Sequence, residues 1–281
     1  MHLLQDSSII QVDYKGGMSM KISSLQMHLA FGETQANYDK ASRFLEKAAA
    51  AGSDIAVLPE LWNTAFYPDD VREIADHDGA ETKAFLSRAA KRYGMNIVGG
   101  SVANRRGEKL YNTTFIVDRE GKLVGEYDKV HLFSPGREDV VFTAGEALNV
   151  FSLDGVTMAS VICYDLRFCE WVRLTALAGA KVLFVPAAWP LSRADHWQLL
   201  NRARAVENQF FVASCNGCGQ SGPMLAGGHS QLIDPWGAVL SQGGAEEAVL
   251  TAAFDLTVVD DVRRKIDVFA DRRPTLYAGT T

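Results

Sequence analysis

Three ionisable side chains of different chemistry each follow an apolar or β-like run of the sequence. Glu60 follows Ile-Ala-Val-Leu-Pro, Lys129 follows Leu-Val-Gly-Glu-Tyr-Asp, and Cys163 follows Met-Ala-Ser-Val-Ile. Side chains at strand ends of an α/β fold can share one pocket, so a thiol, a carboxylate and an ammonium group could meet there. A thiol is a weak nucleophile until it loses its proton, and both a nearby base and a nearby cation favour that loss. This set of groups can perform acyl transfer.

Each of the three residues also has an ordinary structural explanation when it is considered alone. Buried free cysteines are common small apolar fillers, and a single lysine after a strand usually lies on the surface. A carboxylate that follows an apolar run must reach solvent, find a partner or take part in chemistry, because burying it unpaired costs free energy. The interpretation as a catalytic set therefore depends on the three residues occurring together.

The elements that would position these residues alternate between short β-like runs and segments of helical periodicity, which predicts an α/β fold. Arg-Glu-Gly at 119–121 lies between two β-like runs and predicts a hairpin, so the sheets should be mixed. We expect two sheets, each backed by helices. The helices are expected near 38–48, 85–93, 171–177 and 196–208. Strands are expected near 21–27, 54–60, 95–102, 112–118, 122–128 and 181–186, and a further strand is expected to end at 163. The strands at 210–215, 229–235 and 248–255 are expected to complete the second sheet, with Pro-Trp-Gly-Ala at 235–238 as the turn between the last two.

Composition indicates a globular protein that acts on a small molecule. The 281 residues are 47% hydrophobic and 22% charged, and we expect one domain over 20–281 after a loose extension at 1–19. The net charge is −6 and the basic residues are dispersed, which argues against a nucleic-acid partner. No apolar run suits a signal peptide or a membrane helix, and the four cysteines do not suggest a disulfide framework. These features favour a cytoplasmic protein without a membrane partner.

Three motifs that contain these residues resemble the nitrilase superfamily, also called the carbon–nitrogen hydrolases, and the resemblance extends from about Met20 to Tyr277. They are Leu-Pro-Glu ending at Glu60, Asp-Lys-Val-His-Leu-Phe around Lys129, and Cys-Tyr-Asp-Leu-Arg-Phe beginning at Cys163. Each motif alone is a weak signal, but the three together in family order are highly specific. The resemblance implies a four-layer α-β-β-α sandwich with two mixed sheets.

The resemblance also implies roles for the site residues. Glu60 would be the general base and then the general acid, Cys163 the nucleophile, and Lys129 would stabilise the anionic intermediate together with the backbone N–H of Tyr164. The family carries a second glutamate seven residues before the glycine of a Phe-x-x-Gly element. Here Phe142–Gly145 supplies that element and Glu138 that glutamate, which would orient Lys129 or the substrate; its alternative is a solvated loop carboxylate.

The segment from Val185 to Gln209 resembles the omega-amidase branch, which acts on amides of 2-oxo acids such as 2-oxoglutaramate and 2-oxosuccinamate. This branch implies that Trp189 covers the substrate, although Trp189 could equally be a core residue. A dicarboxylic acid monoamide also needs a cation for its far carboxylate, for which Arg167 and Arg193 are the candidates. Arg167 lies in the shared motif and could instead brace neighbouring loops.

Other motifs do not predict a cofactor or a metal. Cys215 and Cys218 have the spacing of half a zinc site, but no second pair of ligands completes it. His131 and His196 are tempting bases, yet the resemblance gives that role to neither, and no phosphate-binding glycine motif is present.

The sequence thus predicts a cofactor-independent thiol amidohydrolase, most simply an omega-amidase. The alternatives are an aliphatic amidase, an N-carbamoyl hydrolase, a nitrilase, or a catalytically silent binding protein on the same scaffold. The family commonly forms homodimers, and the apolar and arginine residues of 267–277 would suit such an interface.

Overall fold

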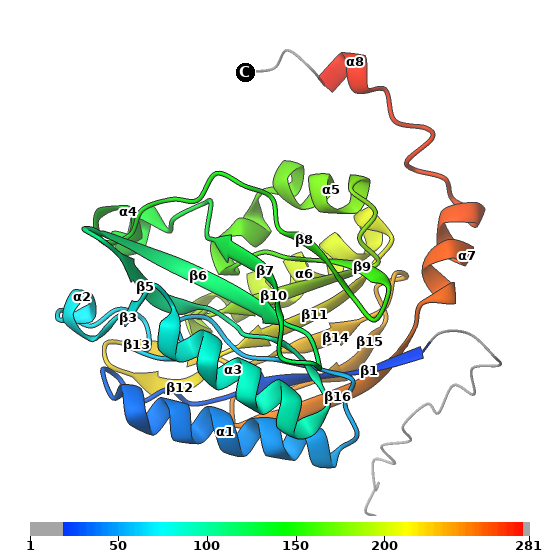
Figure 1. The fold of residues 1–281 in the computed structure, drawn as a ribbon. Coiled ribbons are helices and arrows are strands. Elements are labelled where there is room, and N and C mark those ends of the chain that lie inside the picture. Colours follow the sequence, from blue (N-terminus) through cyan, green and yellow to red (C-terminus); the bar gives the residue numbers. More distant parts are fainter. Residues whose placement is uncertain (1–18, 278–281) are drawn as a thin grey trace, which may run out of the picture.

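The computed structural model describes residues 19–277, and its centre is a pair of mixed β-sheets packed face to face (Figure 1). The first sheet has the strand order β16-β1-β2-β4-β6-β5-β3, with β7 paired to β6; β1 pairs with β16 antiparallel and with β2 parallel. Its strands are β1 (Ser19–Gln26), β2 (Ile55–Val57), β3 (Asp76–His77), β4 (Asn96–Val98), β5 (Val102–Arg106), β6 (Lys109–Val117), β7 (Leu123–Asp128) and β16 (Ala248–Asp255).

The second sheet has the order β15-β14-β11-β10-β9-β8, and its middle strands β9, β10 and β11 are parallel. Its strands are β8 (Val150–Leu153), β9 (Val156–Ser160), β10 (Val182–Ala187), β11 (Phe211–Asn216), β14 (Gln231–Ile233) and β15 (Val239–Gln242). A separate hairpin consists of β12 (Cys218–Ser221) and β13 (Met224–Gly227).

Helices cover the outer faces of both sheets. Figure 1 shows α1 and α3 over the first sheet and α5 and α6 on the opposite side of the molecule, while α8 projects away from the body. The helices are α1 (Thr34–Ala50), α2 (Val71–Ile74), α3 (Ala80–Tyr93), α4 (Glu138–Val141), α5 (Cys169–Leu177), α6 (Ala194–Asn208), α7 (Thr257–Lys265) and α8 (Pro274–Tyr277), with 3₁₀ turns η1 (Ser134–Gly136), η2 (Cys163–Arg167) and η3 (Leu191–Arg193). The expected four-layer α-β-β-α sandwich is confirmed.

Alternation along the strands explains the layers. In β2, Ile55 and Val57 enter the core between the two sheets, whereas Ala56 belongs to the core under α1 and α3. In β11, Phe211 faces the first sheet and Val212 faces the helices on the other side. Because successive strand side chains point to opposite faces, strands buried on both sides read as continuous apolar runs. This burial holds the strand ends, and therefore the residues that follow them, in fixed positions.

The prediction that residues 248–255 complete the second sheet is wrong. Residues 248–255 form β16, which pairs with β1 in the first sheet over eight registered positions from Ser19↔Asp255 to Gln26↔Ala248. The Pro-Trp-Gly-Ala turn instead connects β14 to β15, a strand that the sequence did not reveal, and Asp234 stabilises it by accepting from the N–H groups of Trp236 and Ala238 at 2.9 Å each. Strand pairing across more than 200 residues is not visible in local periodicity.

Several strands are shorter than expected, and the difference matters for the site. The expected strand at 95–102 is interrupted at Gly100, which has a φ of +62° and separates β4 from β5. The strands expected to run to Glu60 and Cys163 end at Val57 and Ser160, so these two side chains lie in the turns beyond the strands. The turns bring Cys163 into the lining of one pocket and Glu60 to a buried position behind that lining.

Two expectations concern the chain ends and membranes. The predicted loose extension, residues 1–19, lies outside the described residues except for Ser19, which already belongs to β1. Within 19–277, no helix combines the length and apolar character needed to cross a membrane.

Candidate active site

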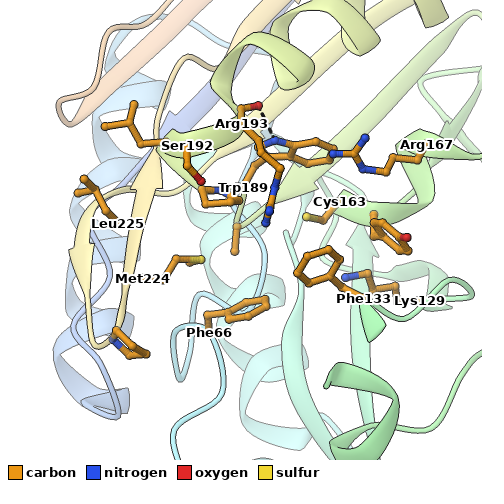
Figure 2. Close-up of a pocket in the computed structure, with 15 residues that line it drawn as sticks. Phe66, Lys129, Phe133, Cys163, Arg167, Trp189, Ser192, Arg193, Met224 and Leu225 are labelled. Carbon is orange, nitrogen blue, oxygen red and sulfur yellow. Dashed lines mark hydrogen bonds between the residues drawn. The ribbon is translucent and has the colours of Figure 1, made fainter. Parts of the chain in front are cut away.

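A pocket of about 610 Å³ opens between the loops that follow the strands of the two sheets (Figure 2). Its lining includes Lys129, Cys163 and Tyr164 together with Arg167 and Trp189. Aromatic and aliphatic side chains supply most of the remaining wall, namely Phe66, Phe133, Ala188, Pro190, Leu191, Pro223, Met224 and Leu225, with Ser192 and Arg193 on one side. Glu60 and Glu138 lie behind this lining, fully buried and in contact with Lys129.

Glu60 is held by three donors, which compensates the cost of burying its carboxylate. Its Oε1 accepts hydrogen bonds from Lys129 Nζ and from Asn112 Nδ2, both at 2.8 Å. Its Oε2 accepts from the backbone N–H of Ala188 at 2.7 Å. Because Ala188 directly follows β10, the carboxylate connects the first sheet to the second.

Lys129 follows β7 and is completely buried. Its Nζ lies 2.8 Å from Glu60 Oε1 and 3.0 and 2.8 Å from Glu138 Oε1 and Oε2. Burial opposes the charge, but the two carboxylates outweigh it, so the pKa of Lys129 is raised well above its usual value. Lys129 is therefore a fixed cation at the base of the pocket.

Glu138 begins α4 and shares the ammonium group with Glu60. Its Oε2 also accepts from the backbone N–H of Phe133 at 2.7 Å. Burial raises the pKa of Glu138, Lys129 lowers it and Glu60 raises it again, with a net upward shift. The solvated-loop explanation of Glu138 does not fit a fully buried carboxylate.

Asn112 joins the two glutamates and was missed in the sequence. Its Nδ2 lies 2.8 Å from Glu60 Oε1 and 3.0 Å from Glu138 Oε1. It occupies a buried position in β6, and its backbone carbonyl accepts from the N–H of Lys129 at 2.9 Å. An Asn inside the run Tyr-Asn-Thr-Thr-Phe was the available signal, since a buried amide needs partners.

Cys163 is the first residue of η2 and has a φ of +45°, in the left-handed region that non-glycine residues seldom adopt. Such strain concentrates at functional sites, where the surrounding structure imposes it. Burial raises the pKa of Cys163 well above its usual value, the Glu60 carboxylate raises it further, and Lys129 opposes the shift. Cys163 is therefore held as a neutral thiol.

Asp165, two residues after Cys163, anchors this turn. Its carboxylate accepts from Tyr127 Oη at 2.7 Å, from the backbone N–H of Ile162 at 2.9 Å, and from the backbone N–H of His131 at 2.9 Å. His131 Nδ1 lies 2.8 Å from the same carboxylate, and its ring stacks on Phe168 with centroids 3.7 Å apart. His131 is therefore part of the scaffold rather than a base facing the pocket.

The four residues expected to contact substrate all line the pocket, with different degrees of restraint. Trp189 is 3% exposed; its backbone N–H donates to Asn216 Oδ1 at 2.7 Å and its Nε1 donates to the carbonyl of Arg193 at 2.8 Å. Arg167 stacks over the Trp189 ring at 4.6 Å, and Tyr164 packs edge-on against Phe133 at 5.1 Å. His196 does not line the pocket but approaches Arg167, with 3.5 Å between Nδ1 and Nη2.

The remaining cysteines lie outside the pocket lining. Cys215 is buried between the two sheets and Cys218 begins β12, and both are free thiols. Over residues 19–277, no group of three or more His, Cys, Asp or Glu side chains is arranged to hold a metal ion.

A buried thiol, a carboxylate and an ammonium group meet at the base of a pocket on an α-β-β-α sandwich, which is the set of groups that hydrolysis through a thiol requires. Comparison with known sequences agrees: the Carbon-nitrogen hydrolase family profile matches residues 21–264. The chain belongs to the carbon–nitrogen hydrolase family.

Individual relatives cover almost the whole chain. The 2-oxoglutaramate amidase of Bacillus subtilis is 45% identical over 260 residues, which are 92% of this chain and 100% of the relative. Omega-amidase NIT2 of Danio rerio is 34% identical over 267 residues, covering 92% of this chain and 96% of the relative. The crystal structure of XC1258 from Xanthomonas campestris, a CN-hydrolase superfamily protein, superposes with a TM-score of 0.85 at 29% identity and covers 91% of this chain and 98% of that one.

Proposed function

We propose that this carbon–nitrogen hydrolase is an omega-amidase that releases ammonia from the terminal carboxamide of 2-oxo acid amides such as 2-oxoglutaramate or 2-oxosuccinamate. The observation that carries the proposal is the position of Cys163, in a strained turn beside the buried Glu60 and Lys129, at the base of a pocket that also contains arginine side chains. The relatives named 2-oxoglutaramate amidase and Omega-amidase NIT2 support the same substrate class.

The first half of the reaction forms a thioester. Cys163 Sγ attacks the amide carbon while Glu60 takes the thiol proton, and a tetrahedral anion results. Lys129 has three N–H groups, of which one binds Glu60 and a second is shared between both oxygens of Glu138. The third N–H is then left for the developing oxyanion, which the backbone N–H of Tyr164 also binds. The C–N bond then breaks as Glu60 passes its proton to the leaving nitrogen, which departs as ammonia.

The second half restores the enzyme. Water attacks the thioester carbon while Glu60 accepts a proton from it, and a second tetrahedral anion forms at the same place. Its collapse breaks the C–S bond, the thiolate regains a proton from Glu60, and the carboxylic acid leaves. Glu138 and Asn112 keep Lys129 and Glu60 in position during both steps. Chemistry of this kind requires no cofactor.

The experiment that tests this proposal is an ammonia-release assay over 2-oxoglutaramate, simple aliphatic amides, N-carbamoyl compounds and nitriles. We expect the highest kcat/KM for the 2-oxo acid amide and loss of at least about 10³-fold in Cys163→Ala. Cys169→Ala is the matched control, because Cys169 is exposed and free but does not line the pocket. Full activity of Cys163→Ala would refute the nucleophile; preference for a nitrile or a carbamoyl compound would refute the substrate class.

We also propose a homodimer in the cytoplasm as the working form. Support for the dimer comes from apolar side chains that are exposed on α5, α6 and the segment after α7.

A further inference from the structure

The pocket is cationic and carries no compensating carboxylate in its lining. Of its lining residues, Lys129, Arg167 and Arg193 are basic, and none is Asp or Glu. The other walls are mainly aromatic and aliphatic. A pocket of this composition favours a small substrate with an anionic group, because an apolar wall strengthens each charge interaction inside it. The three cations differ in how far they are already committed to the protein.

Lys129 is committed to the reaction centre. Its ammonium group contacts Glu60 and Glu138 at 2.8 Å each, so its charge is matched by buried carboxylates. The proposed mechanism uses the remaining N–H of Lys129 for the oxyanion, so a substrate carboxylate bound here would displace the reacting amide. The anionic end of a substrate must therefore bind elsewhere, while its amide faces Cys163.

Arg167 is held by the protein on two sides. Its guanidinium lies over the Trp189 ring at 4.6 Å, and its Nη2 is 3.5 Å from His196 Nδ1. Trp189 is in turn fixed through both its backbone and its indole N–H. Arg167 therefore supports the indole that forms one wall of the pocket.

Arg193 has a fixed backbone and an uncommitted side chain. Its carbonyl accepts the indole N–H of Trp189 at 2.8 Å, which fixes the point from which the side chain departs. Within the described part of the chain its guanidinium has no ion pair or hydrogen bond, and it lies over the Phe133 ring at 5.3 Å. Figure 2 shows this side chain descending into the pocket between Trp189 and Phe133.

We propose that Arg193 is the specificity-determining residue that binds the carboxylate at the far end of the substrate, and that Arg167 positions Trp189 instead. An arginine fork binds a carboxylate through two parallel N–H donors, and its planar face can stay on an aromatic ring while it does so. Phe133 would thus orient the guanidinium without competing for its hydrogen-bond donors. This inference rests on the proposed amidase function, since it assigns the residue that selects ω-amides with an acidic tail.

The test compares glutaramate with pentanamide, which have the same chain length but end in a carboxylate and a methyl group. In Arg193→Met we expect kcat/KM for glutaramate to fall about 10- to 100-fold, mainly through KM, since the variant loses a charged, hydrogen-bonded pair. The loss on pentanamide should be far smaller. Arg193→Lys, which restores the charge but not the fork, should fall between the wild type and Arg193→Met on glutaramate.

Arg167→Met is the matched comparison, because it also removes one pocket arginine. We expect Arg167→Met to lower kcat/KM for glutaramate and for pentanamide by similar factors, because Trp189 is displaced. A loss of kcat/KM confined to glutaramate in this variant would overturn the assignment. Equal losses on both amides in Arg193→Met would overturn it as well.

A binding measurement separates this inference from the proposed function. Glutarate should protect Cys163 from iodoacetamide, and Arg193→Met should require about 10- to 100-fold more glutarate for the same protection. If the wild type releases no ammonia from any amide, the proposed function fails, yet the protection assay still tests Arg193. Unchanged protection in Arg193→Met would refute the carboxylate site even if amidase activity is found.

Discussion

At the scale of individual residues, the centre of the site is the ammonium group of Lys129, which the two carboxylates of Glu60 and Glu138 share. Lys129, Glu60, Glu138 and Asn112 are each inaccessible to solvent, so none of their charges is screened by water. A buried charge is tolerated when it is paired and hydrogen-bonded, and here each carboxylate has at least three donors. The thiol is the exception, because its neighbours together oppose its ionisation. The arrangement therefore favours the neutral thiol over the thiolate.

Glu60→Gln should make the resting thiol more acidic while it slows turnover. Burial raises the pKa of Cys163 first and the Glu60 charge second, so removal of that charge lowers the pKa and increases the thiolate fraction at a given pH. At a pH below the pKa of Cys163, lowering that pKa by one would raise the thiolate fraction about tenfold. The measurement is a pH titration of thiolate ultraviolet absorbance, with Glu60→Gln/Cys163→Ala as the blank. A titration at unchanged or higher pH, or normal turnover in Glu60→Gln, would contradict the role of Glu60.

Asn112→Ala should shift the pH dependence of catalysis. The amide lowers the pKa of Glu138 through a hydrogen bond, so its loss should raise that pKa further and move the acid limb of kcat/KM to higher pH. We also expect kcat to fall about 10- to 100-fold, because Glu60 loses one of its donors. The check is a pH–rate profile of the variant.

Asn104→Ala is the control for this profile. Asn104 is a buried asparagine in the adjacent strand β5, and its Nδ2 bonds Thr113 Oγ1 at 3.2 Å rather than a carboxylate. It should lose stability without moving the profile. An acid limb that moves equally in both variants would show that Asn112 acts only through packing.

At the scale of elements, the site depends on three turns that follow strands β2, β7 and β9. Glu60 lies three residues after β2, Lys129 directly follows β7, and Cys163 lies three residues after β9. The turns are fixed by close backbone contacts: the N–H of Gly145 donates to the carbonyl of Lys129 at 2.9 Å, and Arg204 Nε on α6 donates to the carbonyl of Leu166 at 2.9 Å. Arg204 belongs to the segment from Val185 to Gln209 that resembles the omega-amidase branch, and this contact gives Arg204 a structural role.

Gly145→Ala should disturb the Lys129 turn. A Cβ on Gly145 would lie 2.2 Å from the carbonyl oxygen of Asp128, which is backbone and cannot rotate away. We expect a loss of about 1–3 kcal/mol in unfolding free energy from overpacking, accompanied by a lower kcat as Lys129 is displaced. Denaturant unfolding and ammonia release measure the two effects.

Gly244→Ala is the matched substitution, because a Cβ there meets nothing within 4 Å. It should leave both unfolding and activity near wild-type values. A Gly145→Ala variant as stable and active as Gly244→Ala would show that the close approach of Gly145 to Asp128 does not constrain the turn.

These turns explain how much the sequence could reveal. The apolar runs before Glu60, Lys129 and Cys163 are local patterns, so the sequence could predict that each residue follows a strand. The partners of a strand are decided by contacts between distant segments, which is why β16 was expected in the second sheet although it pairs with β1. Asn112 was missed for a related reason, since its importance comes from two carboxylates that lie 52 and 26 residues away.

At the scale of the whole molecule, the outer face of the second sheet carries an exposed apolar surface. Leu174 and Leu177 on α5, Val206 on α6, Trp236 after β14 and Ile266 after α7 are each 42–52% exposed. They lie on neighbouring elements: Arg173 Nη2 on α5 donates to the carbonyl of Glu207, and Gln209 Nε2 to that of Ile266. Scattered single exposures need no explanation, but several on neighbouring elements suit an interface.

We therefore expect the proposed homodimer to form through this surface and to dissociate when charged residues are introduced into the surface. Leu177→Glu combined with Val206→Glu should convert the dimer to a monomer at micromolar concentration, because two buried carboxylates in each copy would face an apolar partner. Sedimentation equilibrium measures the change. Val140→Glu is the control, since Val140 is 65% exposed on α4, on a different part of the surface, and should leave the mass unchanged. A wild type that sediments as a monomer, or a double variant that still sediments as a dimer, would exclude this face as the interface.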